Sequence, residues 1–132
     1  MVPIAPYETA YAAEGLPFPQ KVKAFLRHFG GLIIRYGTPA ENQDVLEFLA
    51  ERAVQGMGRG GNKGFEELVG VAPLCPIGHY QYGTCILFMD RRGRVFGGSD
   101  EAVTLVGSTG EEAINNILCG IDGKILEPRK TA

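Results

Sequence analysis

The sequence predicts a single domain that combines α-helices with short β-strands. With 132 residues, the chain is long enough to bury one hydrophobic core but not two. Its hydrophobic fraction of 45% and charged fraction of 21% are ordinary for a globular protein. The 19 glycines are many for this length and indicate a turn-rich structure with β content. Amphipathic segments near both ends add helices to these strands.

The N-terminal part predicts two helices. Tyr7 to Glu14 forms a short one that ends at Gly15, so residues 1–17 are expected to be flexible or partly helical within one domain over residues 1–132. Pro19 can stand in the first turn of the second helix. Gly30 follows that helix where a left-handed C-terminal cap is expected. Its apolar residues recur at helical spacing: Phe18, Val22, Phe25, Leu26 and Phe29.

Leu32 to Tyr36 has the β-branched and aromatic content of a strand, but the segment after it has two interpretations. Thr38-Pro39-Ala40-Glu41 matches a capping box with proline at the first helical position, which favours one helix from Pro39 to Gln55. The alternative is a hairpin. It has a loop over Gly37–Gln43, a strand over Asp44–Phe48 and a short helix over Leu49–Gln55.

The middle of the chain predicts a loop and then several short strands. Gly56 to Gly64 is a flexible loop by composition, and Phe65 to Val69 is a helical turn. Val71 to Ile77 contains two prolines and is expected to be an edge or irregular strand. The remaining strand signals are Tyr82–Met89, Arg94–Phe96 and Val103–Val106, with a hairpin turn at Asp90–Gly93.

A final helix is expected to begin at Ser108 or Thr109. Each of these has a glutamate three residues later, Glu111 or Glu112, so two capping boxes overlap. Gly120 ends this helix.

Charge and composition exclude several classes of function. A net charge of −2 without a basic stripe argues against a nucleic-acid partner. No apolar run has the length of a membrane span, and the first residues do not resemble a secretory signal, so no membrane partner is expected. The three cysteines, Cys75, Cys85 and Cys119, form no CxxC pair and suit a reducing cytoplasm.

Two patterns in the sequence are candidate sites of chemistry. Gly56-x-Gly58-x-x-Gly61 matches a dinucleotide fingerprint, but a helical segment precedes it where a strand is required. Cys75 and His79 could form a nucleophile and a base, yet no orienting group or oxyanion hole is evident. Adding Cys85 gives only three metal ligands, with spacing that matches no zinc pattern. We therefore expect no metal and no cofactor.

The other polar candidates have structural explanations. His28 lies near a helix C-terminus beside Phe29 and is expected to be a partly buried, hydrogen-bonded residue. Asp90, Asp100 and Glu101 form a carboxylate set, but aspartate is common in turns because it bonds the local backbone. No grouping of residues supports an enzyme.

The order of elements resembles the SUKH superfamily of bacterial immunity proteins, most closely its third group. The matching pieces are Phe-Leu-x-x-Phe-Gly-Gly-Leu, Glu-x-x-x-Gly (66–70), Pro-Ile-Gly (76–78), Arg-Gly-Arg-Val-Phe (92–96) and a last helix closing Ile-Leu-Cys-Gly. They run from about Ala24 to Gly120. The chain lacks the tryptophan-containing Pro-Gly-Arg segment with which members of this group often begin.

The resemblance implies an α+β fold with a twisted antiparallel sheet flanked by helices. It also favours the hairpin over the long helix at residues 32–48, and we adopt the hairpin. It implies no catalysis and no cofactor, and a cytoplasmic protein that binds and blocks a cognate polymorphic toxin, often a nuclease or nucleic-acid deaminase. The oligomeric state is not implied.

The candidate toxin-binding residues are mostly acidic, because acidic side chains would speed association with a basic nuclease surface. They are Asp100, Glu101, Glu111 and Glu112, together with Arg59 in the glycine loop. Helix capping explains the two helical glutamates equally well and is the preferred account. The alternatives are a housekeeping adaptor of the same fold and a small enzyme that uses Cys75 with His79 or His28.

Overall fold

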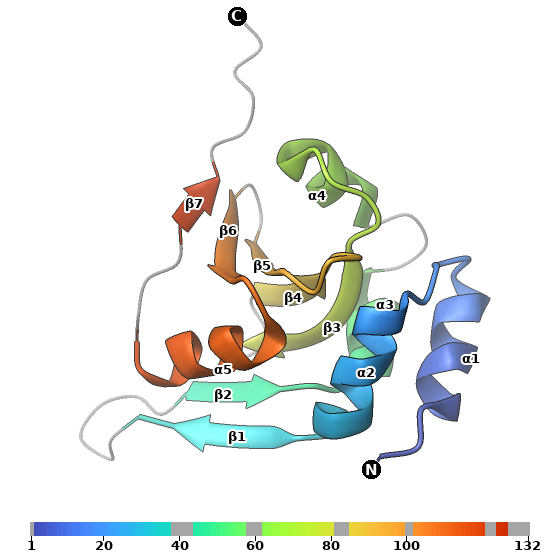
Figure 1. Ribbon diagram of the computed structural model, residues 1–132, viewed down its shortest axis with the longest axis horizontal. Coiled ribbons are helices and arrows are strands. Elements are labelled where there is room, and N and C mark those ends of the chain that lie inside the picture. The colour runs from blue at the N-terminus through green and yellow to red at the C-terminus, as the bar shows by residue number, and fades with distance from the viewer. Residues whose placement is uncertain are drawn as a thin grey trace, which may run out of the picture.

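The computed structural model describes residues 2–37, 44–57, 62–80, 85–99, 102–120 and 124–126. Five helices and seven strands make up this part of the chain (Figure 1). The helices are α1 (Ala5–Ala13), α2 (Gln20–Phe29), α3 (Ala50–Met57), α4 (Asn62–Val69) and α5 (Gly110–Leu118). The strands are β1 (Ile33–Tyr36), β2 (Asp44–Glu47), β3 (Cys75–Tyr80), β4 (Cys85–Met89), β5 (Val95–Ser99), β6 (Ala102–Gly107) and β7 (Lys124–Leu126). The expected α+β fold is confirmed.

The strands form one antiparallel sheet whose spatial order is the order of the chain, from β1 to β7. Each strand therefore pairs with its neighbours in the sequence, and β1 and β7 are the two edges of the described sheet. The sheet is strongly twisted, as the resemblance implied. In Figure 1, β1 and β2 run across the view, whereas β6 stands nearly upright. Strand β7 is not among the strands that the sequence predicts.

The hairpin interpretation of residues 32–48 is confirmed. β1 pairs with β2 in the register Ile33 with Glu47, Ile34 with Leu46, Arg35 with Val45 and Tyr36 with Asp44. The helix from Pro39 to Gln55 is wrong, since Asp44–Glu47 is a strand and helix α3 begins only at Ala50. The predicted capping box, Thr38 to Glu41, lies outside the described residues.

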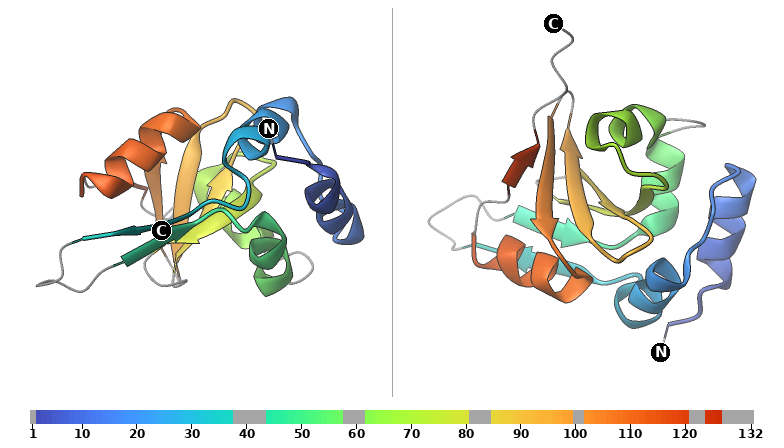
Figure 2. Two further views of the ribbon diagram at one scale, coloured as in Figure 1. Left: turned by 90° about the horizontal axis from the view of Figure 1, so that it is seen from below. Right: turned by 45° about the horizontal axis from the view of Figure 1, so that its top comes forward.

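Apolar side chains pack on both faces of the central strands. On β4, Leu87 and Met89 belong to the larger core cluster, to which α1, α2, α3 and α5 contribute. Phe88 belongs to a second cluster with Leu74, against which Phe65 of α4 packs. Helix α4 thus covers one face and the other helices lie on the opposite side. In both views of Figure 2, α1 and α5 lie at opposite ends of the molecule.

The two N-terminal helices lie close to their predicted positions. Helix α2 buries Val22, Phe25 and Leu26 on the face that the helical spacing indicated. Helix α1 buries Tyr7 and Tyr11, and Gly15, with φ +67°, follows it. The Tyr11 hydroxyl donates a hydrogen bond to the buried carbonyl of Pro76, which ties α1 to the sheet.

The sequence predicted that Gly30 is the left-handed residue after α2, and this is wrong, because Gly31 takes that conformation. Gly30 has φ −59° and ψ 134°, an extended conformation that any residue adopts, whereas Gly31 has φ +81°. Gly30 is still required, but for space. A Cβ atom on Gly30 would lie 2.5 Å from the Leu26 carbonyl oxygen and 2.6 Å from the Tyr7 hydroxyl. The glycine therefore allows α1 to pack directly against the end of α2.

Gly30→Ala is expected to destabilise the protein by about 1–3 kcal/mol, because the Leu26 carbonyl oxygen and the Tyr7 side chain of α1 both block the added methyl group. Chemical denaturation followed by circular dichroism measures this change. The matched control is Gly64→Ala in α4, where an added Cβ meets nothing within 4 Å. That variant should gain up to about 1 kcal/mol from helix propensity. Equal stability of the two variants would contradict the packing of α1 on α2.

Two expectations for the middle of the chain need correction. The segment from Gly56 to Gly64 is not all loop, because α3 runs to Met57 and α4 begins at Asn62. Residues 58–61 lie outside the described residues. The irregular strand predicted over Val71–Ile77 is observed as β3 from Cys75, but it lies between β2 and β4 and is not an edge. Its register with β4 shifts between Pro76 and Gly78, which fits the predicted irregularity.

The predicted turn at Asp90–Gly93 joins β4 to β5. The Asp90 carboxylate is 1% exposed and accepts hydrogen bonds from the backbone N–H groups of Arg92 (3.0 Å) and Arg94 (2.8 Å). It also accepts a bond of 2.6 Å from the Arg94 guanidinium. Gly93 supplies the positive φ, +88°, that the turn requires. Asp90 is thus a structural residue of the turn.

Candidate functional site

The side chains that suggested an enzyme do not form a catalytic site in the described structure. Cys75 is fully buried, and its thiol lies 3.7 Å from the Pro17 carbonyl oxygen, to which it donates. Burial raises the pKa of Cys75 to about 12, so the thiol remains protonated near neutral pH. A protonated thiol is a poor nucleophile.

His79 has a different neighbour. Its Nδ1 lies 4.0 Å from the Glu47 carboxylate on the adjacent strand, and partial burial lowers the pKa of the imidazole. The polar contact of its Nδ1 is thus with Glu47 and not with Cys75. His28 is exposed on α2, which contradicts its predicted partial burial. Among the described residues, no cluster of three or more histidine, cysteine or acidic side chains could hold a metal ion.

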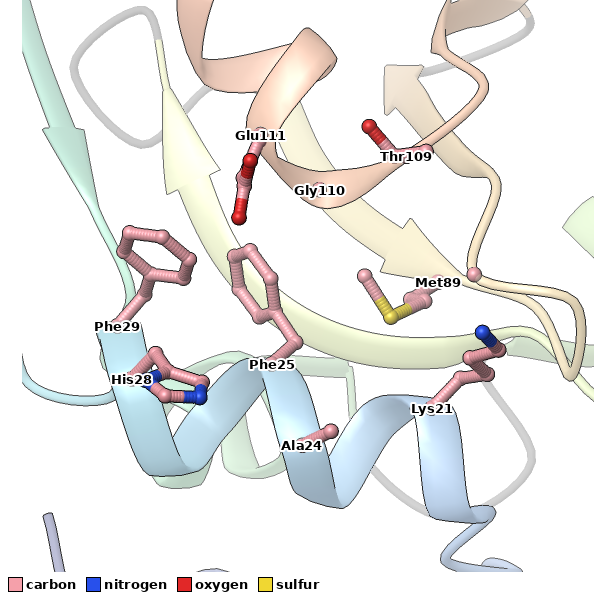
Figure 3. A pocket seen from close by; sticks show the side chains of 10 residues that line it. Lys21, Ala24, Phe25, His28, Phe29, Met89, Thr109, Gly110 and Glu111 are labelled. Carbon is pink, nitrogen blue, oxygen red and sulfur yellow. The ribbon is translucent and has the colours of Figure 1, made fainter. Parts of the chain in front are cut away.

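The candidate site is a groove between α2 and the start of α5, which we call the α2–α5 groove (Figure 3). It has a cavity volume of about 330 Å³. Its apolar side chains are mainly Phe25, Phe29 and Met89, and its polar ones include Lys21, His28 and Glu111. The described residues that line it are Lys21, Ala24, Phe25, His28, Phe29, Met89, Gly93, Thr109, Gly110 and Glu111.

Local sequence positions both walls of the groove. On α2, residues four apart lie on one face, so Lys21, Phe25 and Phe29 line the same wall. On α5, Thr109 is the N-cap and its hydroxyl accepts a hydrogen bond of 3.1 Å from the N–H of Glu112. Gly110 directly follows this cap. A Cβ on Gly110 would overlap the Phe25 ring, so glycine sets how closely the two helices approach.

The two glutamates of α5 have different environments. The Glu112 carboxylate accepts a hydrogen bond of 3.2 Å from the Ser108 N–H, and this completes the capping box with Thr109. The preferred capping account therefore holds for Glu112. The Glu111 side chain is exposed and extends toward Phe25 and Phe29 in Figure 3. It forms no salt bridge with the described residues.

Charges of opposite sign stand at different parts of the groove. Figure 3 shows the Glu111 carboxylate beside the two phenylalanine rings, and the Lys21 ammonium beyond Met89. The Lys21 stem lies along Gly93 of the β4–β5 turn. The rings and Glu111 together form an anionic aromatic end, a combination that suits a cationic side chain with an apolar stem.

The structure does not test toxin binding by any residue of the predicted set. Asp100, Glu101 and Arg59 lie outside the described residues, so their grouping with the α5 glutamates stays a prediction. Of the two predicted residues that the structure describes, Glu111 lines the groove and Glu112 does not. Sequence reasoning missed Phe25, Phe29 and Lys21 as site residues, because the spacing of the phenylalanines indicated only a core-facing helix.

The architecture and the groove define a class of protein: a small α+β protein with a surface suited to binding and, in its described part, no assembled catalytic or metal centre. The model of the SUKH-3 immunity protein family matches residues 6–120, and the chain belongs to this family. Membership implies binding of a cognate toxin and its neutralisation, and the family is generally non-enzymatic. Searches of curated proteins and of solved structures found no significant match. No helix in the described ranges has the length and apolar character needed to cross a membrane.

Proposed function

We propose that this protein neutralises a nuclease or nucleic-acid deaminase toxin in the cytoplasm of the producing bacterium by covering part of the toxin surface. Family membership supports the toxin partner. The single observation that supports the place of contact is the α2–α5 groove, where Glu111, which forms no salt bridge with the described residues, lies beside two aromatic rings. Neutralisation of this kind needs affinity and no chemistry, and a few anchor contacts supply most of the affinity in protein complexes.

The chemistry of the groove fits a basic partner surface. Enzymes that act on nucleic acid carry lysine and arginine side chains that contact phosphates. Such a side chain can place its stem against Phe25 and Phe29 and its charge near Glu111. This contact pairs a carboxylate with a cation and covers apolar surface in the same step. Asp100 and Glu101 would extend the acidic surface if they face the same partner.

Glu111→Lys is expected to raise the dissociation constant for the toxin at least about tenfold, since it replaces attraction by like-charge repulsion. The toxin tested is the product of the neighbouring reading frame, and titration calorimetry measures its binding. The matched control is Glu67→Lys, because Glu67 is exposed on α4, which covers the other face of the sheet. If Glu111→Lys binds the toxin with full affinity and Glu67→Lys does not, the toxin contacts α4 and not the groove.

Co-expression separates immunity from the adaptor alternative. Cells that produce the neighbouring reading frame should die, and cells that also produce this protein should survive. An adaptor with an endogenous partner would give no such rescue. If DNA and RNA are neither cleaved nor deaminated in the cells that die, the toxin attacks something other than nucleic acid.

A further inference from the structure

Strand β1 exposes one of its sides. The described sheet ends at β1, which pairs with β2 alone. The Phe48 N–H donates to the Leu32 carbonyl across the hairpin. Because hydrogen-bonded and non-hydrogen-bonded pairs alternate in an antiparallel ladder, the pairs of Ile33 and Arg35 are non-hydrogen-bonded. The backbone N–H and C=O groups of Ile33 and Arg35 therefore point away from β2.

The side chains of this edge are unusually apolar. Ile33 is 50% exposed and Leu32 is 40% exposed, and the only other exposed large apolar side chain in the described chain is Leu118. Edge strands commonly carry charges or proline that discourage pairing with other chains. Here the one charged residue of β1 is Arg35, which is exposed on the same face as Ile33. Such an edge offers both backbone hydrogen bonds and apolar surface to an added strand.

We propose that the β1 edge takes an extended segment of the toxin as an eighth, antiparallel strand. The segment exchanges backbone hydrogen bonds with Ile33 and Arg35, and it places an apolar side chain against Ile33 and a carboxylate against Arg35. This inference rests on the proposed function and specifies a second contact beside the groove. The two are continuous in the chain, because Phe29 lines the groove and Leu32 begins the exposed edge.

A toxin segment suits this edge better than a second copy of the chain. The residues of the edge, Leu32 to Tyr36, include Arg35 and no acidic residue. Pairing of β1 with another β1 would therefore leave both arginines without an opposite charge across the ladder. A foreign strand with aspartate or glutamate at that position provides the charge.

Amide hydrogen exchange tests the proposal directly. The probe is the product of the neighbouring reading frame, mixed with this protein. In the free protein the amides of Ile33 and Arg35 should exchange rapidly. In the complex their exchange should slow at least about tenfold, because each becomes a hydrogen-bond donor in the ladder. Unchanged exchange at both amides in a stable complex would overturn the inference while leaving the proposed function intact.

Two variants separate the backbone contact from the side chain. Ile33→Pro removes the outward N–H and leaves the β1–β2 ladder intact, since proline is tolerated at such edge positions. Ile33→Thr keeps that N–H and the branched shape. We expect Ile33→Pro to weaken toxin binding at least tenfold and Ile33→Thr to weaken it less, with both retaining the wild-type melting temperature. If both variants bind the toxin with the wild-type affinity, the inference is wrong.

Two further outcomes also have assigned meanings. If the amides of Ile33 and Arg35 are protected in the free protein, and sedimentation shows a dimer that Ile33→Pro dissociates, the edge binds a second copy and the inference is wrong. If the wild-type protein neither binds the probe nor rescues cells, the proposed function is wrong, and the inference that rests on it is wrong as well.

Discussion

Phe25→Ala should lower the free energy of unfolding by about 3–5 kcal/mol, the usual cost of removing a buried aromatic side chain. Phe25 is 7% exposed and meets two other rings. Its centroid lies 5.0 Å from that of Phe48 in an edge-on arrangement and 5.0 Å from that of Phe29. The Phe25 ring also packs against Gly110 at the start of α5. The truncation therefore opens a cavity between α2, α5 and Phe48.

Urea denaturation followed by circular dichroism measures this loss of stability. The control is Leu32→Ala, which removes an apolar side chain of which 40% is exposed and should cost less than about 1 kcal/mol. A cost for Phe25→Ala below about 1 kcal/mol would mean that this face of α2 is not part of the core. Because Phe25 lines the α2–α5 groove, the same variant should also reduce toxin binding.

Asp90→Ala is expected to lower the free energy of unfolding by about 3–5 kcal/mol. The carboxylate accepts two backbone hydrogen bonds and one from the Arg94 guanidinium, and bonds to a charged group contribute about 1.5–3 kcal/mol each. Arg94 is partly exposed, so water can partly replace the hydrogen bond that its guanidinium loses. The two N–H groups of the tight β4–β5 turn have less access to replacement partners.

Asp90→Asn separates charge from geometry. Asparagine keeps one oxygen acceptor for the turn and loses the ion pair, so its cost should fall to about half that of alanine. Both variants are compared with the wild type by urea denaturation. If the two substitutions lower the free energy of unfolding equally, the charge of Asp90 accounts for the whole effect. If neither changes stability, Asp90 does not organise the turn.

Helical spacing and turn chemistry were sufficient for the elements that depend on local sequence. Phe25 and Leu26 predicted the buried face of α2, and Thr109 with Glu112 predicted the start of α5. The β1–β2 hairpin was different, because the local capping signal at Thr38 favoured a helix. Only the resemblance to a family led to the correct choice there.

Local rules failed where a distant part of the chain decides the structure. Gly30 looked like a left-handed cap, but its role comes from Tyr7 on another helix, and Gly31 takes the positive φ. Proline made β3 look like an edge strand, yet β2 pairs with β3 at His79, beyond Pro76, so the proline does not prevent β3 from lying between two neighbours. The groove was equally hidden, since Phe25 and Gly110 are far apart in sequence and their packing alone brings Glu111 beside the rings.

The meander order of the sheet has a consequence for how such a protein can diversify. Every strand pairs with its sequence neighbours, so a change in the length of one connecting turn leaves the pairing of the other strands unaltered. Surface loops tolerate insertions at small entropic cost. Selection can therefore change individual connecting loops as the toxin changes, while the pairing of the strands stays the same.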